Sequence, residues 1–246
     1  FHIEETKNDQ YFSMKLAKHG QIYINDAFGT AHRSHASNAG VTKHFNQKGM
    51  GFLVESELEY LSEAMKKPNK PLTLILGGAK IGTKIDLINR FIQKADNILI
   101  GGGMAFTFLK AKGKDIGGSL VDLSMLPVAK NILANARGNT KLFFPKDFIC
   151  TNSMNDSAKS SVELAGNIPN NLMGLDIGPA SIEHFSNIIN SSGTILWNGP
   201  MGVYEIEGFD LGTIGIAESI GVAKKNGCTA IIGGGDSAAA VKKFGL

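Results

Sequence analysis

The sequence predicts an α/β protein built on an open, doubly wound, mostly parallel sheet with helices on both faces. Short apolar runs rich in β-branched residues alternate with segments of helical periodicity, a pattern that favours parallel strands. At least three of these runs lead into Gly-rich turns that open helices, which is the usual arrangement in an open sheet. The same order of elements also fits a (β/α)8 barrel, and those turns favour the open sheet.

The predicted elements follow one another along the whole chain. Strands are expected over 21–25, 72–76, 97–100, 141–144, 194–197 and 229–232. Helical periodicity covers 56–66, 85–94, 126–136, 181–190 and 211–225. A Gly-Met-Gly turn before the first of these helices, and a Lys- and Pro-containing segment after it, mark a boundary at residues 50 to 71. The helix would join a short N-terminal piece to a larger C-terminal domain.

Composition excludes several classes of protein. The chain has 246 residues, of which 43% are hydrophobic, and this is enough to bury a sizeable core. Its 25 Lys and Arg against 22 Asp and Glu are spread along the sequence, so we expect no nucleic-acid partner. Two cysteines without ligand spacing and the lack of a long apolar run predict a reduced, cytoplasmic protein with no membrane partner. The first residue is not Met, which suggests a fragment.

Glycine clusters follow three of the predicted strands and are the most informative feature. They are Gly77-Gly78, the Gly101 to Gly103 triplet, and the Gly233 to Gly235 triplet. Strand ends of a parallel sheet share one edge, where ligands bind, and glycine lets backbone N–H groups approach an anion closely. These clusters therefore predict a phosphate ligand, while any one of them alone also fits a tight turn with close helix packing.

The first cluster continues into Lys80 and Lys84, which lie four residues apart at an expected helix start. Two cations there repel each other and oppose the helix dipole, and an anionic ligand between them would remove both objections. The alternative is that one or both lysines point into solvent. The segment superficially resembles a P-loop but ends Gly-Thr-Lys, so it is not a Walker motif.

Two later segments supply further polar candidates. Asp236 occupies an expected N-cap position, where a carboxylate commonly caps a helix; beside phosphates it is a natural Mg²⁺ ligand. The segment from Trp197 to Glu205 leaves a strand through a Gly-Pro turn, and an adenosine could pack on Met201 or Val203 while Glu205 accepts from ribose hydroxyls. An ordinary loop fits this composition equally well.

The loop after the first strand gathers His32, Arg33 and His35 within four positions. Because guanidinium binds carboxylate or phosphate through two parallel hydrogen bonds, Arg33 predicts a small-anion site. The histidines also fit ordinary loop positions. A zinc site is disfavoured, because no third ligand has suitable spacing.

Seven motifs together closely resemble the phosphoglycerate kinase family, in that family's order and over essentially the whole chain. They are NDAFGTAHRSHAS, GFLVESELEYL, LILGGAKIGTKI, ILIGGGMAFTFLKA, MGLDIGP, ILWNGPMGVYE and AIIGGGDSAAAV. The resemblance implies a kinase with two Rossmann-like domains. Residues 1–52 would be a remnant of the substrate domain, 53–67 the hinge helix about which the domains close, and 68–246 the nucleotide-binding domain.

The resemblance also implies the reaction and the site. The reaction is reversible phosphoryl transfer between ATP/ADP with Mg²⁺ and 3-phosphoglycerate/1,3-bisphosphoglycerate, a step of glycolysis, by an enzyme expected to be a monomer. Lys84 would stabilise the phosphoryl group in flight, Lys80 the nucleotide phosphates, and Asp236 would hold Mg²⁺ beside Ser237. Arg33 would bind the phosphoglycerate, with His32 and His35 completing a basic patch. The nucleotide pocket would be lined by Gly78, Ala79, Gly101, Gly102, Gly103, Asn198, Pro200, Val203, Glu205, Gly233, Gly234 and Gly235.

Departures from the family pattern set limits on these expectations. Most of the family's N-terminal portion and a C-terminal Gly-rich segment are missing, so we expect the chain as written to lack full activity. A non-catalytic Mg-nucleotide-binding module is the alternative. An NAD-dependent dehydrogenase is disfavoured, because no strict Gly-x-Gly-x-x-Gly is followed by the strand-ending acid that such enzymes need.

Overall fold

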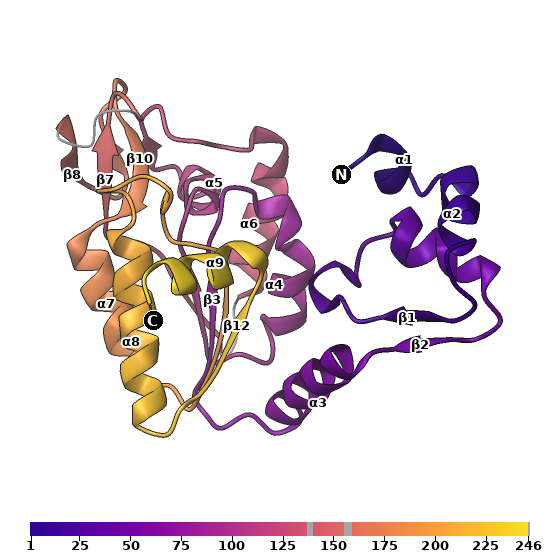
Figure 1. Cartoon of the computed structure of the whole chain (residues 1–246). Helices are drawn as coiled ribbons and strands as arrows, with labels where there is room; N and C mark the ends of the chain where they lie inside the picture. Colours follow the sequence, from indigo (N-terminus) through magenta and orange to yellow (C-terminus); the bar gives the residue numbers. More distant parts are fainter. Residues whose placement is uncertain (137–139, 155–158, 246) are drawn as a thin grey trace. The chain divides into compact units, whose positions relative to one another are not determined.

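The structure is a computed structural model that describes residues 1–136, 140–154 and 159–245 (Figure 1). The chain divides into two compact units, residues 1–67 and residues 68–246. The division falls within the charged segment at which the sequence places a boundary.

The first unit is small and mostly helical. Two short strands, β1 and β2, pair in parallel, and Asp9 caps α2 by accepting a hydrogen bond from Phe12 N at 2.8 Å. The strand expected over 21–25 is shorter than predicted, and its partner strand was not predicted. The elements are α1 (Ile3–Thr6), α2 (Gln10–Ala17), β1 (Tyr23–Asn25), η1 (Phe28–Thr30), η2 (Ala36–Gly40), η3 (Val41–His44), β2 (Lys48–Met50) and α3 (Phe52–Lys66).

The second unit contains a five-stranded sheet in the order β12-β11-β3-β4-β6, with every pair parallel. All five strands were predicted, and the α/β class with a mostly parallel sheet is confirmed. The strands are β3 (Leu72–Leu76), β4 (Asn97–Ile100), β6 (Lys141–Phe143), β11 (Thr194–Asn198) and β12 (Thr229–Gly233). From β3 the chain adds β4 and then β6 on one side of β3. It later adds β11 and β12 on the other side of β3, so the strand order reverses between β3 and β11. Ligands of open sheets bind at such a reversal.

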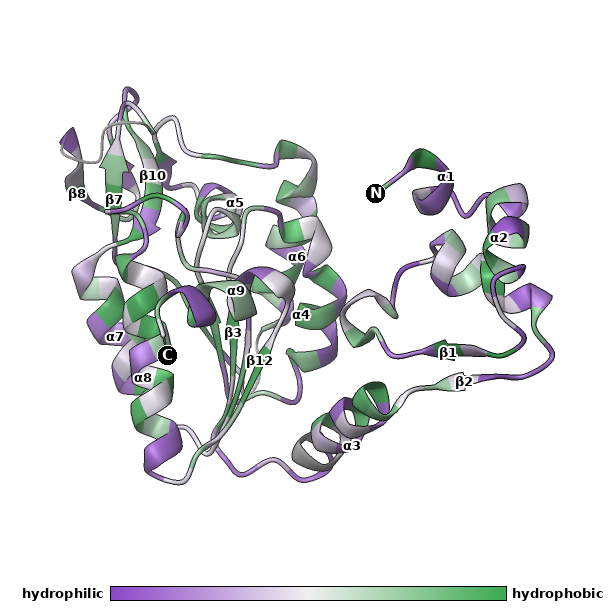
Figure 2. Ribbon diagram, in the orientation of Figure 1, coloured by the Kyte–Doolittle hydropathy of each residue, from purple (hydrophilic) through white to green (hydrophobic). Residues whose placement is uncertain are grey.

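Helices cover both faces of this sheet, with α7 and α8 on one side and α4 and α6 on the other (Figure 1). All five positions of β3 are buried, as expected for a strand covered on both faces, and the strands are the most apolar part of the unit (Figure 2). The helices are α4 (Ile85–Phe91), α5 (Met104–Ala111), α6 (Leu126–Asn135), α7 (Pro179–Asn190), α8 (Leu211–Lys225) and α9 (Gly235–Lys243).

A smaller antiparallel sheet, in the order β10-β7-β8, was not predicted. Two of its strands lack the continuous apolar runs of the main sheet: β8 is largely exposed, and β10 contains Gly174 and Asp176, with a register shift between them. The strands are β7 (Asp147–Thr151), β8 (Ser161–Leu164) and β10 (Met173–Ile177), and a two-residue pair joins β5 (Asp115–Ile116) to β9 (Asn167–Ile168). This sheet places the MGLDIGP segment beside the main sheet's carboxyl edge, because Val203 N in the loop after β11 donates to Leu175 O at 2.9 Å.

Candidate functional site

Four turns meet at the carboxyl edge of the main sheet, two of them at the reversal of strand order. Gly77 follows β3, Gly101 follows β4, Gly199 follows β11 and Gly234 follows β12. Because these strands are neighbours and parallel, the three glycine clusters share one edge, as predicted.

Amides of the first two glycine clusters donate hydrogen bonds to backbone carbonyls in the turn after β11. Gly77 N donates to Asn198 O at 3.0 Å, Gly78 N to Pro200 O at 2.8 Å, and Gly102 N to Met201 O at 3.1 Å. A methyl group on Gly77 would lie 2.0 Å from Pro200 O, so only glycine permits this approach. These three amides serve turn packing, as in the alternative of a tight turn, and are not free to bind a phosphate. Gly78, Gly101 and Gly102 remain candidates for pocket walls.

The third glycine cluster leaves its amides open. Gly234 has a φ of +93° and is the N-cap of α9, so the prediction that Asp236 caps the helix is wrong; Asp236 lies in the first turn. The amides of Gly235 and Asp236 donate to no acceptor among the described residues, and a methyl group on Gly235 would meet nothing within 4 Å. A helix start with free N–H groups and open space above it is an anion-binding arrangement.

Lys84 lies between two of these turns. Its ammonium donates to Asn198 Oδ1, and the side chain is half-buried. Burial lowers the pKa of Lys84, while the nearby Asp236 carboxylate acts to raise it. The structure therefore brings Lys84, Asn198 and Asp236 together from three different elements.

Lys80 and Lys84 are not on one α-helix, contrary to expectation. They flank a single 3-10 turn, η4 (Ile81–Thr83), and α4 begins only at Ile85. Lys80 is exposed, as is its neighbour Ala79. Of the two lysines, Lys84 is thus the one that the fold holds in the site.

The loop after β11 places the remaining pocket candidates. Val203 is half-buried and Glu205 is exposed, so both are open to a ligand. Met201 is 1% exposed and packs under Gly101, so of the two apolar side chains considered for an adenosine only Val203 is accessible. Ser237 is fully buried, and its hydroxyl accepts a hydrogen bond from Gly199 N at 2.7 Å. This contact holds the loop, and burial keeps the hydroxyl from a ligand in the open space above α9.

Asp176 is a residue of this edge that sequence analysis missed. Its carboxyl group is 2% exposed and accepts hydrogen bonds from Gly212 N at 2.6 Å and Ile177 N at 2.8 Å. Burial raises its pKa to about 8 against the lowering effect of these donors, and the nearby Asp210 raises it further. Methyl groups on Gly202 or Gly212 would each lie 2.2 Å from its Oδ1, so the loop and the start of α8 close tightly around this side chain.

The predicted anion-binding residues of the first unit have different surroundings. His32 and Arg33 are exposed, and the Arg33 guanidinium lies 5.5 Å from the centre of the Phe1 ring. His35 is partly buried, with Nδ1 3.7 Å from Glu5 Oε1. His35 therefore has a partner within its own unit, which matches the ordinary loop position considered for it.

Among the described residues no three His, Cys, Asp or Glu side chains form a metal-binding cluster. Mg²⁺ commonly keeps several waters and is bound through one or two carboxylates together with substrate phosphates. Asp236, exposed in the first turn of α9 beside free amides, fits that kind of site.

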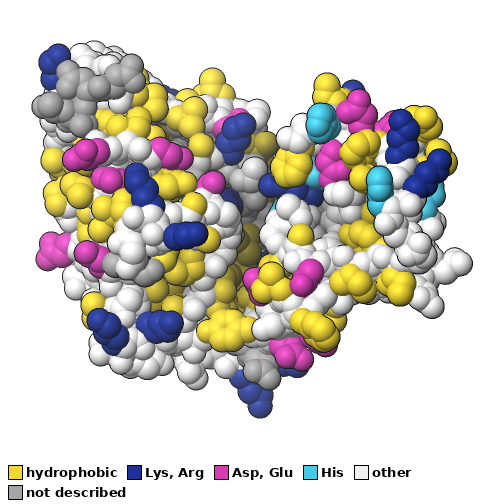
Figure 3. Space-filling view, in the orientation of Figure 1, with side chains coloured by type: hydrophobic (Ala, Val, Ile, Leu, Met, Phe, Trp, Pro, Cys, Tyr) yellow, Lys and Arg dark blue, Asp and Glu magenta, His cyan; other side chains and the backbone are white. Residues whose placement is uncertain are grey.

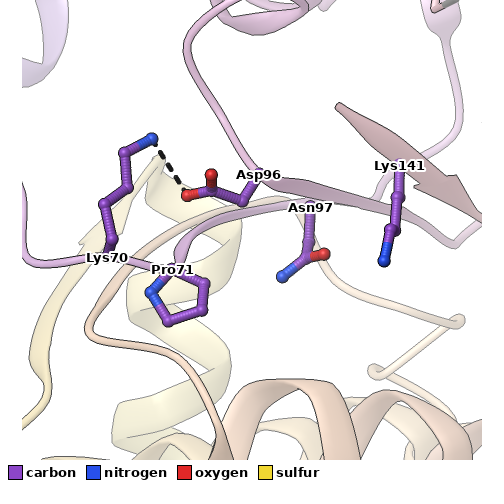
Figure 4. Close-up of a pocket in the computed structure, with 5 residues that line it drawn as sticks. All are labelled: Lys70, Pro71, Asp96, Asn97 and Lys141. Carbon is purple, nitrogen blue, oxygen red and sulfur yellow. Dashed lines mark ion pairs between the residues drawn. The ribbon is translucent and has the colours of Figure 1, made fainter. Parts of the chain in front are cut away.

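One pocket lies at the opposite end of the sheet. It has a volume of about 390 Å³ and is lined by residues from the amino ends of β3, β4 and β6 (Figure 4). Within it the Asp96 carboxylate is paired with Lys70 at 2.9 Å and also accepts from Leu72 N at 2.6 Å. The Asp96 carboxylate therefore holds the starts of the strands together, and we do not take this pocket as the functional site.

On the visible face, Lys and Arg side chains are interspersed with Asp and Glu (Figure 3). In the part of the chain that the structure describes, no helix is both long and apolar enough to cross a membrane.

Comparisons with known proteins agree with one another. A family model described as phosphoglycerate kinase matches residues 1–246. The phosphoglycerate kinases of Chlorobium chlorochromatii and Nostoc punctiforme are 48% and 47% identical over 247 residues, covering 100% of this chain and 62% of each relative. Solved structures of phosphoglycerate kinase from Coxiella burnetii and Pyrococcus horikoshii match with TM-scores of 0.80 and 0.82 at 38% and 30% identity, covering 100% of this chain and 63% of each. The chain thus spans less than two thirds of the length of these relatives.

Proposed function

The chain belongs to the phosphoglycerate kinase family, and on that premise we propose that it carries the nucleotide site and part of the acid-substrate site of a glycolytic phosphotransferase. The reaction is reversible phosphoryl transfer between ATP and the carboxylate of 3-phosphoglycerate, giving ADP and 1,3-bisphosphoglycerate. We place this reaction in the cytoplasm.

One observation carries the proposal: the Lys84 ammonium, the Asp236 carboxylate and the free amides of α9 come together at the carboxyl edge of the parallel sheet. Phosphoryl transfer needs little covalent chemistry from the protein and depends on positioning and charge neutralisation. The amides and the α9 dipole bind nucleotide phosphates, and Lys84 neutralises the charge of the group being transferred.

The remaining assignments carry over from the family's motifs. Asp236 would hold Mg²⁺, which would offset the charge of the nucleotide phosphates when bound. Val203 and Glu205 flank the adenosine, and exposed Lys80 contacts the nucleotide phosphates from the other end of its 3-10 turn. The acid substrate is bound by Arg33 of the first unit.

A non-catalytic Mg-nucleotide-binding module is the second candidate. It requires only the nucleotide site, whose residues all lie within the second unit. The two candidates share the nucleotide site and differ in turnover, so phosphoglycerate-dependent ATP consumption by the chain separates them.

Replacing Asp236 with Asn is expected to weaken MgADP binding by about tenfold or more while changing metal-free ADP binding much less. The reason is that the carboxylate contacts the metal rather than the nucleotide. Calorimetric titration of the full-length natural protein, with and without Mg²⁺, measures both affinities. The control is Asp115→Asn, an exposed carboxylate in β5. An equal loss with and without Mg²⁺ would refute the metal-binding role.

A further inference from the structure

The turn that presents Arg33 wraps around one side chain, that of Asn38. The amide nitrogen of Asn38 lies within hydrogen-bond distance of three backbone carbonyl oxygens: those of Thr30 at 3.1 Å, Ala31 at 2.9 Å and Arg33 at 2.7 Å. Its Oδ1 in turn accepts a hydrogen bond from Asn25 Nδ2 at 2.5 Å. The Asn38 amide is therefore fixed at one end by the strand before the turn, and at the other end it draws the turn's carbonyls inward.

The inward carbonyls determine where the neighbouring amides point. In a trans peptide the C=O and the N–H of the following residue lie in opposite directions, and the peptide bonds of this turn are trans. Because the carbonyls of Ala31 and Arg33 face Asn38, the N–H groups of His32 and Ser34 face away from it. Both residues are exposed, and neither N–H donates to an acceptor among the described residues.

The residues directly before and after Arg33 therefore each have a free backbone amide that points to the outer side of the turn. Outward-facing amides of a turn can form an anion-binding concavity, here on either side of Arg33 N, which donates to Thr30 O at 2.9 Å. Hydrogen bonds to an ionised acceptor are about twice as strong as neutral ones. Nearby, the buried Glu5 carboxylate already accepts hydrogen bonds from the amide and hydroxyl of Ser37. It also lies 3.7 Å from His35 Nδ1, so this edge of the imidazole faces Glu5.

We propose that the backbone N–H groups of His32 and Ser34 bind the same oxyanion as Arg33, and that Asn38 is the positioning residue that turns them outward. The ligand class is a small acid bearing a carboxylate or phosphate group. The proposal rests on the proposed function, in which Arg33 belongs to the acid-substrate site.

The kinetic test is Asn38→Ala in the full-length natural protein. Loss of the amide donors lets the carbonyls of the turn swing out, so the KM for 3-phosphoglycerate is expected to rise about tenfold or more while the KM for ATP stays within about twofold. Asn131→Ala, an exposed asparagine on α6 whose Oδ1 accepts a hydrogen bond from Asn135, is the matched control and should change neither value. If Asn38 acts through the turn, combining Asn38→Ala with Arg33→Ala costs less than the sum of the two single effects. Equal increases in both KM values, or additive effects, would overturn the assignment.

A second measurement keeps the two proposals separable. In ¹⁵N-resolved NMR spectra of the wild-type protein, the His32 and Ser34 amide resonances should shift on titration with 3-phosphoglycerate, and this response should be lost in Asn38→Ala. Titration with inorganic phosphate and with glycerate shows which end of the acid is bound. Shifts without turnover would support the anion site and reject the kinase function. Turnover with both amides unshifted would reject the anion site and leave the kinase function standing.

Discussion

Replacing Lys84 with Met is expected to lower kcat by about 10²-fold or more while changing the dissociation constant of MgADP by less than about tenfold. Methionine keeps the length and apolar stem of the side chain and removes only its charge. The ammonium is half-buried next to Asn198, and charge in a partly desolvated site is worth more than at the surface. An interaction that strengthens as the phosphoryl group moves appears in kcat, whereas one made equally throughout appears in binding.

Variants of two other lysines serve as comparisons for Lys84→Met. Lys80→Met is expected to show the opposite division, with weaker MgADP binding and a smaller loss of kcat, because Lys80 is assigned to the nucleotide phosphates. Lys130→Met removes an exposed cation from α6 and should change neither quantity. Steady-state kinetics and calorimetry on the full-length natural protein measure all three variants. An unchanged kcat in Lys84→Met would remove Lys84 from the transfer step.

The main sheet could be predicted because each of its strands carries its own signal. β3 is buried at every position and reads as a continuous apolar run bounded by turn residues. Two strands of the small antiparallel sheet have no such local signal, since β8 is largely exposed and β10 contains both Gly174 and Asp176. Those strands form because partners distant in sequence satisfy their backbone groups, and that information is not contained in a short window.

The site was predictable to the same extent. Lys84 and Asp236 stood out because a cation at a helix start and a carboxylate after a glycine cluster are local patterns, and the structure brings both together at the sheet edge. The use of the glycines was not predictable: the amides of Gly77 and Gly78 bond to carbonyls more than a hundred residues later in the chain. The glycines in the sequence indicated where another segment of backbone had to come close. Only the fold shows that this segment is the turn after β11.

Asp176 shows the limit most clearly. In sequence it is one acid in a strand-like segment, and nothing local marks it as buried. Its burial arises because the loop before Asp210 and the start of α8 close over it, with glycines at 202 and 212 leaving room for the carboxyl group. Because burial raises the pKa of Asp176, its effect can be measured as a pH dependence of the free energy of unfolding.

The free energy of unfolding of the chain is expected to fall by about 1.4 kcal/mol per pH unit, owing to Asp176 alone, between about pH 5 and pH 7.5. Burial raises the pKa of Asp176 from 3.8 to about 8 in the folded chain. Between those values the folded state holds a proton that the unfolded state has released. The contribution of Asp176 to the free energy of unfolding is therefore complete below its pKa in the unfolded chain. It is lost as the pH rises through its pKa in the folded chain.

Asp176→Asn tests this because the amide does not titrate. The variant is also expected to lose about 1–3 kcal/mol at every pH, since one of the two N–H donors would face an NH2 group. The diagnostic quantity is the slope against pH, which urea unfolding followed by the fluorescence of Trp197, the single and fully buried tryptophan, measures at each pH.

Asp96→Asn is the control of opposite sign. Burial acts to raise the pKa of Asp96, but the Leu72 amide and the Lys70 ammonium together outweigh it, so the pKa is lowered. Stability from Asp96 is present above its unfolded pKa and is lost only as the pH falls below about 4. Removing Asp96 should therefore leave the slope from pH 5 to 7.5 unchanged, whereas removing Asp176 should flatten it. If wild type and Asp176→Asn have the same slope, Asp176 is ionised in the folded chain, and the Gly212 and Ile177 amides stabilise its carboxylate more than burial destabilises it.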